Sequence, residues 1–220
     1  RVEYQQDWLL QPLELQGHKQ ASWRTDPCQA GPLGCLADIG SHAYNLAAYI
    51  TQSYPHRVLA DLTTQVAGRV LDDVCQVLLH YPNGARGSLF ASQVSNGKEN
   101  QLRIEICGSL ASLSWCQQHP EALHFSSSTA ASRTLRRARA DTQAASQQFA
   151  FLPAGHSEGY LEAFAQLYHK IADELLQIQK HEDLCRVEQA WQDMAFLHAC
   201  LESQQQGNSW QNLPASGCTQ

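Results

Sequence analysis

The sequence lacks long hydrophobic runs, an excess of basic residues and a high content of charge. None of its apolar stretches approaches the roughly 20 residues that a membrane-spanning helix needs, and we expect no signal peptide. Its 220 residues include 15 Lys and Arg against 21 Asp and Glu, and the net charge of −6 argues against a general nucleic-acid-binding protein. We therefore expect a cytoplasmic globular protein that binds neither membranes nor nucleic acids.

Closely spaced cysteine pairs are also missing. The eight cysteines include no C-x-x-C pair, and Cys75, Cys107 and Cys200 lie inside apolar strand-like or helical runs. Cysteine in such runs behaves as a small hydrophobic residue. We therefore expect reduced thiols rather than a disulfide framework, and the spacing gives a structural zinc site no support.

The stretch from Gly34 to Leu46 combines a glycine-rich loop with an acid and a histidine. Asp38 and His42 are four residues apart in an expected helix from Asp38 to Thr51, so their side chains share one face while an apolar stripe anchors another. Such a pair is suited to accepting a proton from an alcohol. On spacing alone, an acid that stabilises the helix N-terminus and a partly buried, hydrogen-bonded histidine form the simpler interpretation.

The pattern of the remaining residues predicts an α+β fold. A strand within Arg1–Leu10 and a long loop over Pro12–Gly34 precede the helix. About six strands joined by short turns follow it, and Asn83-Gly84 predicts a hairpin between two of them. These strands are His56–Thr64, Asp73–Tyr81, Ala85–Gln93, Gln101–Cys107, Ala111–Cys116 and Ala122–Phe125.

The last third of the sequence predicts a loop, two helices and a tail. Ser126–Gln148 is rich in small polar residues and arginine, which favours a solvated loop. Helices are predicted at Ser157–Gln179 and Leu184–Gln205, and the aromatic residues of their apolar stripes are expected in the core. The tail Gly207–Gln220 reads as a surface segment whose Trp210 and Leu213 pack back.

The long loop contains the sequence Trp23-Arg24-Thr25-Asp26-Pro27. An Arg–Asp pair could simply hold the loop. Alternatively, an indole and a guanidinium could stack on a sugar ring and hydrogen-bond its hydroxyls. The residues alone leave both interpretations open.

Together these motifs resemble the C-terminal domain of the Gfo/Idh/MocA oxidoreductases, the family of glucose–fructose oxidoreductase and inositol dehydrogenase. The matching segments occur in the family's order up to about Ala165. They are Tyr4-x-Gln6-x-Trp8, Trp23-Arg24-Thr25-Asp26-Pro27, Gly34-Cys35-Leu36-Ala37-Asp38-Ile39-Gly40-Ser41-His42, Gly68-Arg69 with Asp72-Asp73, Tyr81-x-Asn83-Gly84 and Pro153-x-Gly155-His156-x-Glu158-Gly159-Tyr160.

The resemblance implies a fold, an activity and a set of site residues. The fold is a large, mainly antiparallel open sheet with helices on one face, like that of dihydrodipicolinate reductase. It forms a single domain over residues 1–220 (core about 1–206, tail 207–220) that assembles into a dimer or tetramer through the other sheet face. The implied activity is oxidation of a CH–OH group of a sugar, inositol or related polyol, with NAD or NADP held mainly by a separate N-terminal Rossmann domain. The implied catalytic residues are His42 and Asp38, and the substrate-binding residues are Gln6, Trp23, Arg24 and His156.

The sequence itself supplies no cofactor site. No Gly-x-Gly-x-x-Gly turn follows a strand, and the family's Glu-Lys-Pro motif is missing. Because the sequence also begins within a strand pattern, we expect it to be the C-terminal domain of a longer protein and inactive alone. Two alternatives stay open: a sugar-binding scaffold without a cofactor domain, and a metal-dependent hydrolase with Asp38, His42 and His156 as ligands.

Overall fold

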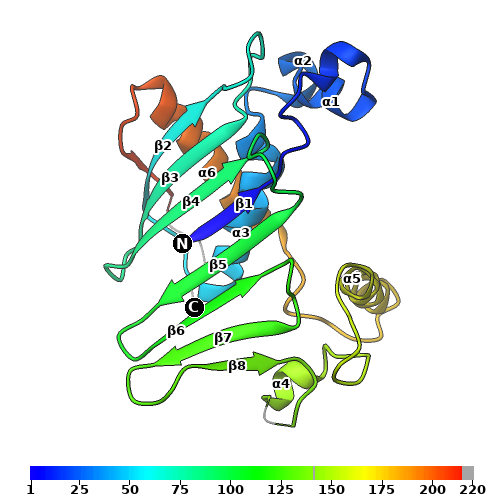
Figure 1. Cartoon of the computed structure of the whole chain (residues 1–220). Helices are drawn as coiled ribbons and strands as arrows, with labels where there is room; N and C mark the ends of the chain where they lie inside the picture. Colours follow the sequence, from blue (N-terminus) through cyan, green and yellow to red (C-terminus); the bar gives the residue numbers. More distant parts are fainter. Residues whose placement is uncertain (141, 215–220) are drawn as a thin grey trace. The chain divides into compact units, whose positions relative to one another are not determined.

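The computed structural model describes residues 1–140 and 142–214, and the chain divides into two compact units. Unit one comprises Arg1–Ile104 and Glu188–Gln220, and unit two comprises Glu105–Val187. Nine strands and a smaller number of helices make up the described residues (Figure 1). That residues 1–220 act as a single substrate-binding domain stays a prediction.

Unit one is built on a sheet in which six strands take part, in the order β5-β1-β4-β3-β2-β9. Every neighbouring pair in this order runs antiparallel except β1 and β4. The predicted turn at Asn83-Gly84 joins β3 to β4, so the hairpin and the mainly antiparallel sheet are confirmed. The strands are β1 (Val2–Gln5), β2 (Arg57–Thr63), β3 (Val74–His80), β4 (Arg86–Ser92), β5 (Gln101–Cys107) and β9 (Gln211–Asn212).

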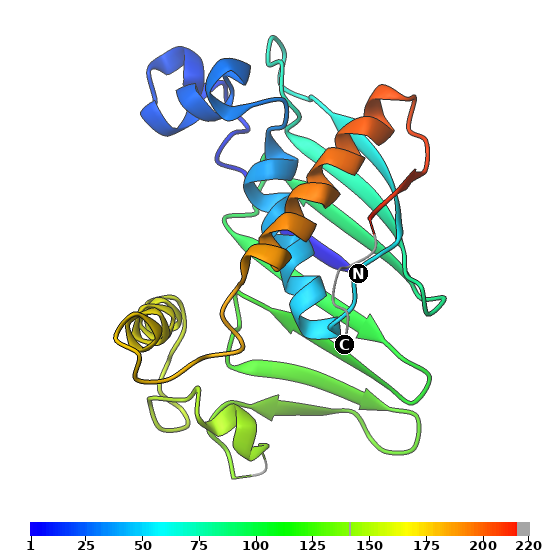
Figure 2. The ribbon, with the colours of Figure 1, turned by 180° about the vertical axis from the view of Figure 1, so that it is seen from behind.

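Two helices of unit one cover one face of this sheet, as predicted. Figure 2 shows α3 (Ser41–Thr51) and α6 (Val187–Gln205) side by side across the strands. The rings of Tyr44 and Phe196 stack between them with centroids 3.9 Å apart, and both side chains are buried. The core of unit one therefore lies between the sheet and this helix pair.

The strands bury alternate residues, as a sheet with one covered face requires. In β3, Cys75, Val77 and Leu79 are buried, whereas Gln76 and Leu78 between them are exposed. Leu78 is 49% exposed on the face opposite the helices. One face of the sheet thus carries the core and the other is open.

The predicted loop over Pro12–Gly34 is wrong in part, because three short helices interrupt it. Such helices are too short to show a helical period, and only their caps mark them in the sequence. The Asp26 carboxylate accepts the Cys28 N–H at 2.9 Å, and Pro27 occupies the first position of the helix. Asp26 is therefore a helix cap and not the partner of Arg24. The three helices are η1 (Leu13–Gln16), α1 (Lys19–Arg24) and α2 (Pro27–Ala30).

Unit two contributes three antiparallel strands to the nine-stranded sheet and also contains two helices. Strand β8 and helix α4 fall within Ser126–Gln148, so the prediction of a solvated loop there is wrong in part. Leu135 of β8 faces Leu123 across the ladder, and the Arg133 guanidinium lies 5.2 Å from the ring centroid of Phe125. The arginines around Leu135 conceal this alternation in the sequence. The elements are β6 (Ala111–Cys116), β7 (Ala122–Ser127), β8 (Arg133–Arg136), α4 (Ala144–Gln147) and α5 (Tyr160–Leu175).

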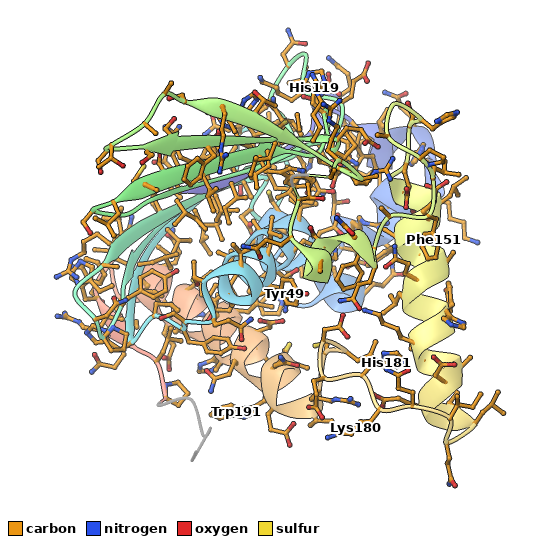
Figure 3. The ribbon with its side chains drawn as sticks, turned by 90° about the horizontal axis from the view of Figure 1, so that it is seen from below. Tyr49, His119, Phe151, Lys180, His181 and Trp191 are labelled. Carbon is orange, nitrogen blue, oxygen red and sulfur yellow. The ribbon has the colours of Figure 1, made fainter. Side chains whose placement is uncertain are left out.

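The last two helices are shorter and less buried than predicted. They cover Tyr160–Leu175 and Val187–Gln205. In α5, Tyr160 is 75% exposed and Tyr168 is 66% exposed, and Trp191 of α6 is 52% exposed. Figure 3 shows Trp191 on the side of α6 that faces away from the strands. The prediction that these aromatic side chains are core residues is wrong, because an apolar stripe does not show what covers it.

The start of the predicted tail packs against the sheet of unit one. Leu213 is buried, and the ring centroid of Trp210 lies 4.0 Å from that of His80. This part of the prediction is confirmed, whereas residues 215–220 lie outside the described residues. Over the described ranges 1–140 and 142–214, no helix is long and apolar enough to cross a membrane.

Candidate active site at the start of helix α3

A buried aspartate fixes the point at which the chain enters the helical segment. The two carboxylate oxygens of Asp72 accept the N–H of Gly34 at 2.6 Å and that of Leu36 at 2.8 Å. The carbonyl of Asp72 accepts the N–H of Cys35 at 2.8 Å. These bonds satisfy donors that the start of a helix leaves without partners. A Cβ at position 34 would lie 2.3 Å from the Asp72 carbonyl oxygen, so only glycine fits there.

The first turn of the segment is π-helical. Over η2 (Leu36–Gly40) the chain forms a π turn that the N–H of Ser41 closes by donating to the carbonyl of Leu36, and α3 begins only at Ser41. The prediction of a regular helix from Asp38 is therefore wrong in its first turn. The wider turn changes the angle between Asp38 and His42, and no hydrogen bond or ion pair between described residues joins these two side chains. Such turns are rare and frequently occur at functional sites.

Asp38 is held by two side-chain donors from other parts of unit one. Its Oδ2 accepts the Arg24 Nε–H at 3.1 Å and the Gln93 Nε2–H at 2.7 Å. The Arg24 Nη1 also donates to the Gln20 Oε1 at 2.6 Å, which holds the guanidinium on α1. Both bonds to Asp38 end on Oδ2, and no hydrogen bond from the described residues ends on Oδ1. Because the Asp38 side chain is 29% exposed, Oδ1 can accept a hydrogen bond from a ligand.

Two tryptophans surround the guanidinium of Arg24. Its central carbon lies 4.2 Å from the ring centroid of Trp23 and 5.8 Å from that of Trp8. The indole N–H of Trp8 donates to the Gln6 Oε1 at 2.9 Å. Of the predicted site residues, Gln6, Trp23, Arg24 and Asp38 therefore belong to one connected cluster. Arg24 thus pairs with Asp38 rather than with Asp26, and its guanidinium also lies near both indoles.

His42 is exposed in the first turn of α3. Its ring approaches that of Tyr4 from β1 with centroids 6.4 Å apart and an interplanar angle of 61°. An exposed imidazole can exchange a proton with a ligand. The simpler interpretation of the sequence, a partly buried and hydrogen-bonded histidine, therefore does not fit this structure.

A second carboxylate lies on the same side of α3. Asn45 Nδ2 donates to the Asp193 Oδ2 at 2.8 Å and so links α3 to α6. Burial raises the pKa of Asp193, and the Asn45 hydrogen bond and the charge of His42 oppose that rise. Sequence reasoning missed both Asp193 and Gln93, because they lie 148 residues from Asn45 and 55 residues from Asp38. No local spacing signals contacts of that range.

His156 belongs to unit two, in the segment before α5. Its N–H donates to the Pro153 carbonyl at 3.2 Å, and its own carbonyl accepts the Arg137 Nη2–H at 2.8 Å. Its side chain is exposed. These bonds fix the backbone at His156, and the substrate-binding role of its side chain stays a prediction.

The described residues do not fit a nicotinamide dinucleotide or a metal ion. A dinucleotide site needs a glycine turn between a parallel strand and a helix. Among the strand pairs described, only β1 and β4 run parallel, and no such turn follows either. Within the same residues, no group of three His, Cys, Asp or Glu side chains could hold a metal, so the hydrolase alternative finds no ligand cluster.

Other proteins are similar to this chain in sequence and in fold. Residues 1–114 match the GFO/IDH/MocA C-terminal domain family. The uncharacterized oxidoreductase YfiI of Bacillus subtilis (strain 168) is 30% identical over 200 residues, which cover 86% of this chain and 50% of that protein. A levoglucosan dehydrogenase of Pseudarthrobacter phenanthrenivorans is 27% identical over 135 residues, which cover 51% of this chain and 33% of that protein.

The fold is shared with a solved structure of an inositol dehydrogenase homolog from Azotobacter vinelandii complexed with NAD+. The TM-score is 0.85 at 26% identity, over 96% of this chain and 57% of that one. The chain thus spans about half the length of YfiI and of this homolog. From its fold and its matching residues, the chain belongs to the Gfo/Idh/MocA oxidoreductases and corresponds to their C-terminal domain.

Proposed function

We propose that this chain is the substrate-binding domain of an NAD- or NADP-dependent dehydrogenase that oxidises a CH–OH group of a sugar, inositol or related polyol. The observation that carries the proposal is an exposed His42 one turn after an Asp38 carboxylate that Arg24 and Gln93 hold. The names of two relatives, a levoglucosan dehydrogenase and an inositol dehydrogenase homolog, fall in this substrate class.

Each residue of the cluster has a role suited to a polyol. His42 accepts the proton of the hydroxyl that is oxidised. Asp38 Oδ1 accepts a hydrogen bond from a neighbouring hydroxyl, while Oδ2 stays bonded to Arg24. The indole of Trp23, 38% exposed, offers a flat apolar face to the carbon skeleton of the ring. The remaining members of the proposed site are Gln6, which orients Trp8, and His156.

The nicotinamide cofactor, when bound, supplies the hydride acceptor. Because the described residues do not fit it, we propose that another part of the complete protein holds it. We also propose a cytoplasmic location, because eight cysteines without a disulfide-like spacing suit a reducing compartment.

The proposal is tested with protein expressed from the complete coding sequence, by following NADH and NADPH formation with a panel of polyols that includes levoglucosan and myo-inositol. His42→Ala is expected to lower kcat by about 10²–10⁴-fold, the usual contribution of a general base. Far-UV circular dichroism and the cofactor Kd should not change. The control is His198→Ala, because the side chain of His198 is 71% exposed on α6 outside the cluster.

An unchanged kcat in His42→Ala would contradict the role of His42. Polyol binding by the wild type without turnover of any substrate would favour the scaffold alternative.

A further inference from the structure

The proposed reaction leaves a positive charge on His42, and that charge needs a carboxylate nearby. Asp38 supplies this charge only in part, because its Oδ2 is already bonded to Arg24 and Gln93. No hydrogen bond or ion pair between described residues joins Asp38 to His42. The structure presents a second acidic group, Asp193, beside α3.

Asp193 lies on α6, which packs beside α3 (Figure 2). Its Oδ2 accepts the Asn45 Nδ2–H at 2.8 Å, and Asn45 follows His42 by three residues on the same side of α3. Its Oδ1 is buried and has no hydrogen-bond partner among the described residues. Because only one of its two oxygens is hydrogen-bonded, this buried carboxylate attracts a nearby positive charge strongly.

The charged and titratable groups around Asp193 come from α3. The charge of His42 lowers the pKa of Asp193, against the larger effect of burial, which raises it. Burial and then the Asp193 charge raise the pKa of Tyr44, whose buried hydroxyl also lacks a partner among the described residues. The Asn45 hydrogen bond holds the Asp193 carboxylate against α3 one helical turn from His42, where it can attract a positive charge on that histidine.

We propose that Asp193 is a positioning residue for the reaction, whose carboxylate stabilises the imidazolium that forms when His42 takes the proton of the substrate hydroxyl. The proton moves from that hydroxyl oxygen to a ring nitrogen of His42, and Asp193 remains a carboxylate throughout. The proposal rests on the proposed function. In this scheme Asp38 hydrogen-bonds the substrate, whereas Asp193 stabilises the protonated base, His42.

The proposed interaction between His42 and Asp193 is tested first in the 220-residue chain, without substrate or cofactor. The pH titration of the Asp193 side-chain carboxyl carbon is followed by NMR in the wild type and in His42→Gln. Removing the histidine charge is expected to move the Asp193 midpoint upward by roughly half a pH unit or more. His198→Gln is the matched control, because His198 lies on α6 itself but pairs with Glu202, and it should leave the midpoint unchanged.

The catalytic consequence is tested in protein from the complete coding sequence. Asp193→Asn retains an oxygen for Asn45 and should fold normally, which thermal unfolding checks. We expect kcat to fall about 10-fold with an unchanged KM, since the base is weaker but the substrate is not touched. The acidic limb of the kcat/KM profile should move to lower pH, because His42 then holds its proton less firmly. Asp193→Glu should restore both properties, and Glu202→Gln, a carboxylate elsewhere on α6, should alter neither.

The two proposals fail in different ways. An Asp193 midpoint that His42→Gln leaves unchanged would overturn the role of Asp193 even in an active enzyme. So would an Asp193→Asn enzyme with the kcat and pH profile of the wild type. Absence of turnover in the wild type would overturn the proposed function instead.

Discussion

Arg24 makes more contacts in the cluster than any other predicted site residue. Its Nε bonds to Asp38, its Nη1 bonds to Gln20, and its planar face lies over Trp23. A guanidinium can make these contacts together because it is flat and carries donors along its edge. An ammonium group on a flexible stem can make one of them at a time. The orientation of Asp38 therefore depends on the shape of this side chain as well as on its charge.

Arg24→Lys is accordingly expected to damage the site while keeping its charge. We expect kcat/KM for a polyol to fall by about 10-fold, because the lysine cannot hold Asp38 and cover the indole at once. Steady-state kinetics in the complete protein measure the effect. Arg57→Lys is the matched control, since Arg57 also stacks on a tryptophan, Trp210, at 5.2 Å but lies outside the cluster. Equal losses in the two variants would show that the effect belongs to stacking in general.

At the scale of elements, the helical start from Gly34 to Ser41 controls the geometry of the site. Asp72 fixes its first N–H groups, and the π turn over Leu36–Gly40 sets the angle from which Asp38 and His42 project. The Cβ of an alanine at position 40 would also come within 2.9 Å of the Leu36 side chain. The segment has little room to adjust on either side.

Gly34→Ala should therefore disturb the whole segment. Its Cβ would lie 2.3 Å from a backbone oxygen, which cannot rotate away as a side chain can. We expect the free energy of unfolding to fall by about 1–3 kcal/mol, the usual cost of overpacking. Urea unfolding followed by circular dichroism measures it. In Gly159→Ala, where the added Cβ would meet nothing closer than 3.8 Å, the change should be smaller. A Gly34→Ala protein as stable as the wild type would contradict the role given to Asp72.

The sequence could predict those elements that are specified by residues close together in the chain. Alternation along β3 and the Asn83-Gly84 turn are local signals, and they specified the hairpin correctly. The π turn could not be predicted, because it is the first turn of the segment and too few apolar positions precede it to reveal a change of period. The Arg24–Asp38 pair combines two residues that were predicted separately. By contrast, Gln93 and Asp193 reach the site only through the fold, and no periodicity near them marks that role.

For the whole molecule, the open face of the unit-one sheet is the feature without an assigned partner. Leu78 on this face is 49% exposed, although it lies in the middle of the hairpin strand β3. An apolar side chain on an uncovered sheet face favours association through that face. We expect the protein to form a homo-oligomer, a dimer or tetramer, in which these faces meet.

Leu78→Asp should reduce the oligomer to a monomer at micromolar concentration, because a buried charge without a partner disfavours the interface. Size-exclusion chromatography with light scattering measures the mass. Val70→Asp is the control: Val70 is 73% exposed in unit one but lies in the segment before β3, outside the strands. A wild type that is already monomeric, or a Leu78→Asp protein with the wild-type mass, would rule out this interface.

The position of β1 has a consequence for the order in which the molecule assembles. This strand has four residues, yet Val2 faces Leu89 on one side and Ile104 on the other. Strand β1 can insert only after β4 and β5 have been made, although both follow it in the sequence. Its pairing with them closes long loops, which is slow in folding. Tyr4 and Gln6 come to the site with it. We therefore expect the site to lack Tyr4 and Gln6 until β1 has inserted between β4 and β5 during refolding.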